Sequence, residues 1–274
     1  MNYELNMVNP FSLSGKTILV TGASSGIGEA LAYEFAKHHT KLILSARRKE
    51  ELERVAANCL NLGSEAFIYL LDLSVSAQLE EVSKSILGTF GHVDFLVNNG
   101  GISQRSLVIE TPIEVDRQIM EVDFFSGVIL TKSILPAMEH RKFGHIIVIS
   151  SITGLFGFPM RSAYAAAKHA ILGFYETLWA ELHEKGINVT IACPGRIRTN
   201  ISYHALTKSG KPHGVMDHGL NEGVSAEKCA KKIMKAVQKK KIVTYIGGKE
   251  LLMVYFKRYI PWVFYKLVSK VQPT

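Results

Sequence analysis

The sequence predicts an α/β fold in which about seven parallel strands form a doubly wound sheet with helices on both faces. Short apolar runs alternate with longer amphipathic segments along the 274 residues, which is typical of repeated βαβ units. The apolar runs are hydrophobic throughout rather than at every second residue, as expected for strands buried on both faces. No repeat or low-complexity linker interrupts this order before residue 200, so a single domain is the simplest interpretation.

The expected elements follow one another at regular intervals. Strands are predicted at 16–21, 41–45, 66–71, 93–97, 145–149, 187–193 and 242–246. Helices are predicted from the glycine-rich TGASSGIG run to about 38, at 48–60, from an N-cap at Ser74 to about 90, and at 112–141, 162–185 and 226–240. The glycine-rich stretch 200–223 fits no element and is expected to be an insertion or lid.

Composition excludes several classes of protein. Hydrophobic residues make up 47% of the chain, too many for a disordered protein. Three widely spaced cysteines provide neither a disulfide framework nor a CxxC metal site, so no metal is expected and a reducing, cytoplasmic location is favoured. The N-terminal sequence lacks the basic and apolar regions of a signal peptide.

The positive charge is concentrated at the C-terminus. Residues 225–274 hold 12 Lys and Arg against two Glu, whereas residues 1–224 hold 20 basic and 22 acidic residues. No motif typical of nucleic-acid readers accompanies this charge, so nucleic acid is not an expected partner. We divide the chain into a catalytic domain, 1–248, and a hydrophobic, basic extension, 249–274.

The glycine-rich turn predicts a dinucleotide site. Gly22, Gly26 and Gly28 lie between the first strand and the first helix. Glycines there permit a tight turn and a close backbone approach to a pyrophosphate, which the helix N-terminus would bind. Together with the alternating pattern, they indicate a Rossmann-type fold.

The end of the second strand favours NADP(H) over NAD(H). An NAD site usually has an acidic residue there for the ribose 2′-hydroxyl. This sequence instead has Arg47 and Arg48, with no acid before Glu50. Two guanidinium groups suit a 2′-phosphate by charge and by bidentate hydrogen bonding.

Three residues form a candidate catalytic group. Tyr164 and Lys168 are four residues apart in a predicted helix and therefore share a face. A lysine ammonium near a phenol favours the phenolate, which suits the tyrosine to acid–base work. The third, Ser151, follows Ser150 at the end of the fifth strand, at the carboxyl edge of the sheet, where ligands bind in open α/β folds.

The motifs occur together and in order. TGASSGIG at 21–28, NNGG at 98–101, ISS at 149–151, YAAAK at 164–168 and PGRIRT at 194–199 resemble the short-chain dehydrogenase/reductase family over roughly residues 14–200. The C-terminal extension and the runs LTKSILPAM and YAAAKHAILGFYE resemble that family's dehydrogenase/reductase members 7 and 7B.

The resemblance implies a role for each matching residue. Tyr164 would exchange the proton, Lys168 would hold the ribose and favour the phenolate, and Ser151 would polarise the substrate oxygen. Asp72 would meet the adenine, with Asn98 on the adenosine side. The implied cofactor-binding set is Gly22, Ser24, Ser25, Gly26, Ile27, Gly28, Arg47, Arg48, Asp72, Leu73, Asn98, Gly100, Tyr164, Lys168, Pro194, Gly195, Ile197 and Thr199.

One position departs from the family pattern. Asp123 stands where the family usually has an asparagine that supports a water linking the lysine to solvent. If the backbone carbonyl carries that role, the change is harmless. If the amide side chain matters, the carboxylate would compete for Lys168 and slow the proton relay. We expect the enzyme to remain active and include Asp123 among the catalytic residues.

The expected function is oxidoreduction of a hydrophobic ketone or secondary alcohol, such as a steroid-, retinoid- or lipid-like compound. Alternatives are a 3-oxoacyl thioester reductase and a catalytically weak NADP-binding regulator or scaffold. The resemblance also implies a homodimer or homotetramer. The aromatic and basic run 251–268, interrupted by Pro261, is too broken to span a membrane. It suits a flap over an apolar pocket, a subunit contact or the surface of an anionic membrane.

Overall fold

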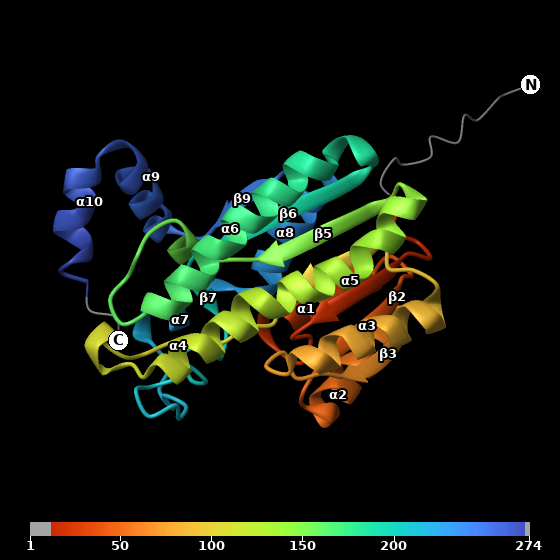
Figure 1. The fold of residues 1–274 in the computed structure, drawn as a ribbon, viewed down its shortest axis with the longest axis horizontal. Helices are drawn as coiled ribbons and strands as arrows, with labels where there is room; N and C mark the ends of the chain where they lie inside the picture. Colours follow the sequence, from red (N-terminus) through yellow and green to blue (C-terminus); the bar gives the residue numbers. More distant parts are fainter. Residues whose placement is uncertain (1–11, 272–274) are drawn as a thin grey trace, which may run out of the picture.

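A seven-stranded sheet forms the centre of the protein (Figure 1), whose computed structural model describes residues 12–271. Its strand order is β3-β2-β1-β4-β5-β6-β9, and all neighbouring strands are parallel. This confirms the predicted doubly wound sheet. The strands are β1 (Thr17–Thr21), β2 (Lys41–Ala46), β3 (Glu65–Leu70), β4 (Phe95–Asn98), β5 (Gly144–Ile149), β6 (Ile187–Pro194) and β9 (Val243–Ile246).

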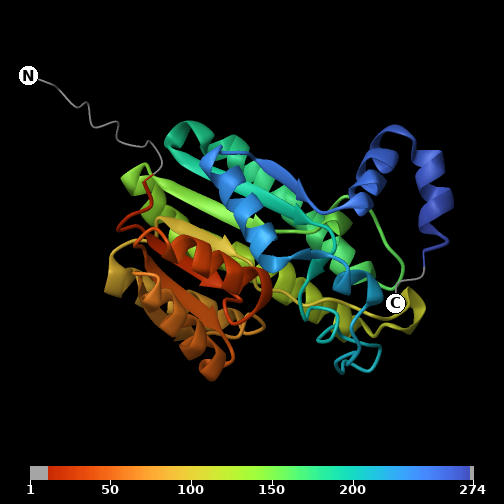
Figure 2. The same ribbon diagram turned by 180° about the vertical axis from the view of Figure 1, so that it is seen from behind.

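Helices cover both faces of the sheet. One face carries α1 (Gly26–Ala36), α2 (Lys49–Asn61) and α8 (Ala226–Gln238), and the other carries α3 (Ser76–Phe90), α5 (Ser126–Arg141) and α6 (Ser162–Leu182). Figure 1 shows α5 and α6 in front of the sheet. Figure 2, the view from the opposite side, shows α1 and α8 in front of it. Successive β1 residues alternate between the two cores: Ile18 packs with the α1 side and Leu19 with the α5 side.

The strand order creates a crevice at the carboxyl edge of the sheet. The chain proceeds from β1 outward through β2 to β3, then returns to the other side of β1 for β4. At such a switch point the connecting loops diverge to opposite faces and leave room for a ligand. The glycine-rich turn after β1 and the NNGG run after β4 meet at this crevice, where the Asn99 amide donates to the Thr21 carbonyl at 2.9 Å.

The helix predicted at 112–141 contains a wider turn. It comprises α4 (Ile113–Met120), a π-helical segment η2 (Glu121–Phe125) and then α5. Such π-helical turns are rare and often mark functional sites. This one carries Asp123, whose side chain is fully buried.

Two other local predictions need correction. The predicted N-cap at Ser74 is wrong, because α3 begins at Ser76 with Val75 as its N-cap. The Ser74 hydroxyl instead donates to the carboxylate of Asp72 at 2.7 Å. The helix predicted to reach residue 185 ends at Leu182 and continues as a single 3₁₀ turn, η4 (His183–Lys185).

The stretch 200–223 is mostly irregular, as predicted, but is anchored at both ends. Two short strands, β7 (Ile197–Arg198) and β8 (Val224–Ser225), pair on either side of it, and α7 (His218–Asn221) lies within it.

The C-terminal extension is helical. It contains η5 (Lys249–Leu251), α9 (Leu252–Tyr259) and α10 (Pro261–Val268). These helices project from one end of the molecule (Figures 1 and 2). Among residues 12–271, no helix is both long and apolar enough to cross a membrane. The N-terminal segment in which we expect no signal peptide lies largely outside the described residues.

Candidate active site

A cleft of about 340 Å³ lies at the carboxyl edge of the sheet. Loops after β1, β2, β3, β4, β5 and β6 contribute to its walls. Most of the residues predicted from the sequence line it, and these are Gly22, Ser24, Ser25, Gly26, Ile27, Arg47, Arg48, Asp72, Leu73, Gly100, Ser151, Tyr164, Lys168, Pro194, Gly195, Ile197 and Thr199.

The glycine-rich turn has room for backbone only. Gly22 has φ +63°, and a Cβ added there would lie 2.8 Å from the Cα of Gly100. A Cβ on Gly28 would lie 2.3 Å from the carbonyl oxygen of Gly22. Gly28 does not line the cleft; it lets α1 pack against the turn. The first turn of α1 thus presents its N-terminal amides to the cleft, as pyrophosphate binding requires.

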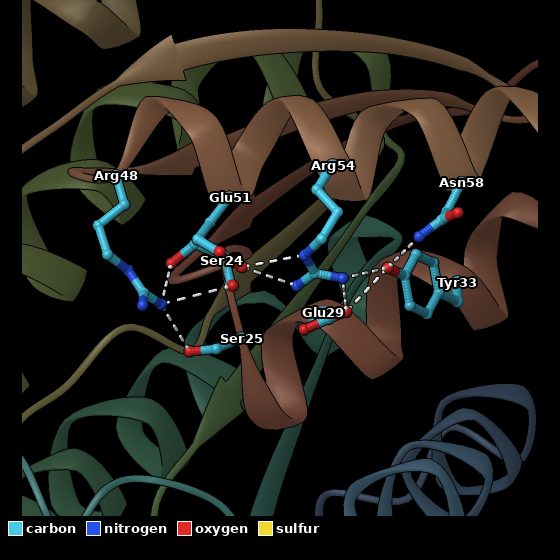
Figure 3. Close-up of polar contacts among 8 residues, drawn as sticks. All are labelled: Ser24, Ser25, Glu29, Tyr33, Arg48, Glu51, Arg54 and Asn58. Carbon is cyan, nitrogen blue, oxygen red and sulfur yellow. Dashed lines mark hydrogen bonds and ion pairs between the residues drawn. The ribbon is translucent and has the colours of Figure 1, made fainter.

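Arg48 extends over this turn (Figure 3). Its Nη2 atom donates to the Ser24 hydroxyl at 3.1 Å and to the Ser25 hydroxyl at 3.1 Å. The guanidinium group therefore lies beside the turn, on a side chain that is otherwise exposed. Neighbouring Arg47 also lines the cleft. Burial would raise the pKa of Asp72, but hydrogen bonds from Ser74 and the charge of Arg47 keep that pKa below its ordinary value.

A polar network fixes the helix that begins after Arg48. Arg54 on α2 pairs with Glu29 on α1 at 2.7 Å and with Glu51 at 2.9 Å. The Tyr33 hydroxyl donates to Glu29 at 2.8 Å and accepts from the amide of Asn58 at 3.0 Å. Figure 3 shows these side chains bridging the two helices. The bridge holds α2, which begins directly after Arg48, against α1.

The three candidate catalytic side chains meet in the cleft. Tyr164 and Lys168 lie one turn apart on α6, with the Lys168 Nζ 5.5 Å from the centre of the Tyr164 ring. The Ser151 hydroxyl donates to the carbonyl of Pro194 at 3.3 Å and accepts from the amide of Thr153 at 3.2 Å. All three side chains are largely buried and border the same cleft, so a carbonyl group there could contact a hydroxyl from each of two elements.

Lys168 is held by a buried carboxylate. Its Nζ lies 3.1 Å from Asp123 Oδ2 and donates to the carbonyl of Ile149 at 3.2 Å. Asp123 Oδ1 accepts from the amide of Ile102 at 2.7 Å. Burial raises the pKa of Asp123. Burial alone would lower the pKa of Lys168, but the charge of Asp123 raises it above its ordinary value. Asp123 does not line the cleft, but it contacts Lys168, which does.

The stretch 200–223 is fastened to the walls of the cleft by buried charges. Asp217 accepts two bonds from Arg105, at 3.2 and 2.6 Å, and one from Arg161 at 2.7 Å. Arg105 follows the NNGG segment, and Arg161 precedes Tyr164 by three residues. The side chains of Arg105 and Asp217 are 2% and 8% exposed. The ion pairs therefore join this stretch to the segment after the NNGG run and to the segment just before Tyr164.

Asn98 is placed away from the cleft. Its amide nitrogen donates to the hydroxyls of Thr131 and Tyr175 at 3.0 and 3.1 Å. It thereby joins the end of β4 to α5 and α6 beneath the site. The next residue, Asn99, lines the cleft and donates to the carbonyl of Thr21 at 2.9 Å.

Sequence reasoning missed several lining residues. Asn99 and Gly101 belong to the NNGG run, so the motif itself could have indicated them. Ser150, which the sequence placed beside Ser151 at this edge of the sheet, also lines the cleft. The stretch 200–223 contributes Asn200, Ile201, His204 and Leu220. Its irregular sequence gives no periodicity from which their direction could be inferred.

Comparison with known proteins agrees with this geometry. A sequence profile described as short chain dehydrogenase matches residues 16–209. Dehydrogenase/reductase SDR family protein 7-like of Drosophila melanogaster is 40% identical over 263 residues, covering 94% of this chain and 81% of the relative. Dehydrogenase/reductase SDR family member 7B of Mus musculus is 38% identical over 262 residues, with the same coverage of 94% and 81%.

A solved structure shows the same fold. The short chain dehydrogenase/reductase of Burkholderia phymatum, crystallised in complex with NAD, superposes with a TM-score of 0.82 at 22% identity. The match covers 96% of this chain and 98% of that protein. The sequence matches, the sheet and the position of the cleft lead to one conclusion: the chain belongs to the short-chain dehydrogenase/reductase family of oxidoreductases.

Proposed function

We propose that the protein is an NADP(H)-dependent oxidoreductase that interconverts a hydrophobic ketone and its secondary alcohol. The observation that carries the proposal is the convergence of Ser151, Tyr164 and Lys168 on the cleft that also contains the glycine-rich turn. A dinucleotide whose pyrophosphate lay at that turn would extend along the carboxyl edge of the sheet toward these residues. When bound, the nicotinamide supplies or accepts the hydride.

Side chains of the protein transfer the proton and bind the substrate oxygen. In reduction, the Tyr164 hydroxyl donates its proton to the carbonyl oxygen as that oxygen gains negative charge. The Ser151 hydroxyl donates a hydrogen bond to the same oxygen and holds it in place. The ammonium group of Lys168 stabilises the phenolate that remains. In oxidation, the phenolate accepts the proton from the alcohol instead.

The cofactor preference is proposed from Arg47 and Arg48. Both line the cleft after β2, where NAD-binding sites usually place an acid. Arg48 is already held beside Ser24 and Ser25, so little conformational freedom would be lost on binding a 2′-phosphate. We expect NADPH to bind at least tenfold more tightly than NADH. Arg47→Ala with Arg48→Ala should abolish that preference while leaving NADH affinity within threefold of wild type.

The substrate is proposed to be apolar. The hydrophobic side chains of Ile102, Val122, Ile201 and Leu220 line the cleft, and such walls suit a steroid-, retinoid- or lipid-like compound. The test is NADPH oxidation against a panel of hydrophobic carbonyls that includes 3-oxoacyl thioesters. Turnover by wild type but not by Tyr164→Phe supports the proposal. Preference for the thioesters would assign the alternative activity.

A second candidate, a cofactor-binding regulator with little turnover, is favoured by one observation only. The Asp123–Lys168 ion pair is fully formed in the core and would compete with the ribose hydroxyls for the lysine. Tight NADPH binding without turnover on the whole panel, together with turnover gained in Asp123→Asn, would support that candidate.

We also propose that the protein is a homodimer or homotetramer, as its family resemblance implies, and that it resides in the cytoplasm. The half-exposed Phe125 beside the start of α5 supports a contact through the long helices. Cys59, Cys193 and Cys229 are free and buried, which suits a reducing compartment. Light scattering of the purified protein and cell fractionation test these two proposals.

A further inference from the structure

We propose that α9, α10 and the neighbouring 3₁₀ turn η1 (Val108–Glu110) form a surface that binds anionic lipid bilayers. We call it the lipid-binding surface. Its C-terminal part consists of large apolar and aromatic side chains that are between 41% and 75% exposed, namely Leu252, Tyr255, Tyr259, Trp262, Tyr265 and Leu267. Tryptophan and tyrosine have an apolar body and a polar tip, and they concentrate where bilayer meets water.

The two helices are firmly attached to the domain. Val254 and Phe264 on their inner sides are 8% and 1% exposed and pack on Ile152 and Phe156. The rings of Phe156 and Phe264 are 5.2 Å apart in an edge-to-face arrangement. The exposed aromatic side chains therefore belong to an ordered amphipathic pair of helices with its own core.

The charge of the surface complements an anionic bilayer. Residues 249–270 contain Lys249, Lys257, Arg258, Lys266 and Lys270. The one acidic residue in this range, Glu250, accepts a hydrogen bond from the backbone amide of Arg196 at 2.8 Å. Basic side chains around an apolar face attract anionic lipid headgroups.

A second apolar patch lies at the same end of the molecule. Val108 and Ile109 of η1 are 74% and 93% exposed. In both ribbon views the yellow segment that contains η1 lies at the end from which the blue helices α9 and α10 project (Figures 1 and 2). Two isolated surface hydrophobes would need no explanation, but their place beside an aromatic pair of helices extends the apolar area.

The other roles considered for the extension fit less well. Among the described residues that line the 340 Å³ cleft, none comes from α9 or α10, so the lining of the cleft gives no support to a role for the pair as a flap. A second copy docked symmetrically on this surface would bring two sets of five basic side chains together, which is unfavourable without matching acids. A bilayer supplies both the apolar interior and the negative charge.

The contact would be shallow. Each helix has eight residues and spans about 12 Å, too short to cross a bilayer but suited to lying at its surface. The helices pack on the segment that directly follows Ser151, so binding would hold the domain at the source of an apolar substrate. This last consequence rests on the proposed function; the binding itself does not.

Vesicle co-sedimentation of the full chain tests the proposal. We expect binding to phosphatidylserine–phosphatidylcholine vesicles and at least tenfold weaker binding to pure phosphatidylcholine. The double variant Tyr259→Ser, Trp262→Ser should lose at least tenfold in affinity for the mixed vesicles, as should Arg258→Gln with Lys266→Gln, two exposed basic side chains. The matched control, Lys231→Gln with Lys232→Gln on α8, lowers the net charge equally and should bind as wild type.

A spectroscopic measurement locates the contact. Trp179 and Trp262 are the two tryptophans of the chain, so Trp179→Phe leaves Trp262 as the reporter. Its emission should shift to shorter wavelength with mixed vesicles and be quenched by brominated acyl chains. The proposal is overturned if wild type does not bind mixed vesicles, if the α8 control loses as much affinity as the surface variants, or if Trp262 remains unquenched. Unchanged circular dichroism and NADPH binding establish that each variant is folded.

Discussion

Replacing Asp123 by asparagine removes a buried charge while keeping the shape of the side chain. The carboxylate lies 3.1 Å from Lys168 Nζ, and the two side chains are 0% and 5% exposed. In Asp123→Asn the Lys168 ammonium group keeps its hydrogen bond to the Ile149 carbonyl, at 3.2 Å in the wild type, but it has no neighbouring negative charge. One amide oxygen cannot replace both carboxylate oxygens, which now serve Lys168 and the Ile102 amide.

The expected loss of stability follows from this geometry. Breaking a buried ion pair by removing one partner costs about 3–5 kcal/mol. Because the asparagine retains one hydrogen bond, we expect the lower end, about 3 kcal/mol. Turnover should change by less than about tenfold, or ~1.4 kcal/mol in activation free energy, since Tyr164 and Ser151 are untouched.

The sign of the pH dependence of stability distinguishes the loss of the Asp123 charge from a simple loss of packing. In the wild type the pKa of Lys168 is raised, so its contribution to stability is complete below about pH 10.4 and is lost only at higher pH. In the variant, burial is expected to lower that pKa below the unfolded value. The variant should then gain stability as the pH rises toward 10.4, by up to about 1.4 kcal/mol per pH unit.

Urea unfolding of both proteins at pH 7, 8 and 9 measures the effect, with NADPH oxidation measured in parallel. Asp94→Asn is the matched control, because Asp94 is a buried carboxylate that pairs with Arg141 at 3.0 Å away from the cleft. It should lower stability without altering turnover. A pH-independent stability difference for Asp123→Asn would refute the charge argument. A gain in turnover of a hundredfold or more would show that the natural carboxylate impedes the proton relay.

Three further changes have defined outcomes. His145 is buried with its pKa lowered to about 3 by burial, so wild-type stability should fall by about 2 kcal/mol from pH 6.5 to 5; His145→Gln should remove that slope in urea titrations. Gly28→Ala should cost about 1–3 kcal/mol and abolish NADPH binding by fluorescence titration, whereas Gly88→Ala, with open space around it, should not destabilise the protein. Asp217→Asn leaves Arg105 without its carboxylate and should lower the melting temperature, corresponding to about 3–5 kcal/mol; an unchanged melting temperature would contradict the anchoring role of this aspartate.

The fold was predictable because the sheet is buried on both faces. Runs such as the one at 41–45 contain apolar residues at consecutive positions, which only a strand covered from both sides tolerates. The glycine-rich turn was equally predictable from the sequence, since Gly22 has a positive φ and Gly28 has no space for a side chain. Both features are local consequences of backbone sterics and strand burial.

Features that depend on tertiary contacts were not predictable. The π-helical turn at 121–125 appears in no periodic pattern. Asn98 was expected beside the cofactor but is held by Tyr175, which lies 77 residues away in the chain. The pairing of Asp217 with Arg105 likewise joins residues 112 apart. Composition identified the C-terminal extension as aromatic and basic, but only the packing of Phe264 on Phe156 shows which side chains remain exposed.

The central claim is that Tyr164 transfers the proton in a cleft that also binds NADPH. Its most direct test is a single-turnover measurement, in which protein preloaded with NADPH is mixed with the best carbonyl of the panel. We expect Tyr164→Phe to bind NADPH with an affinity close to that of the wild type but to oxidise it at least about a hundredfold more slowly. Oxidation by Tyr164→Phe within a few-fold of the wild-type rate would show that Tyr164 is not the proton donor.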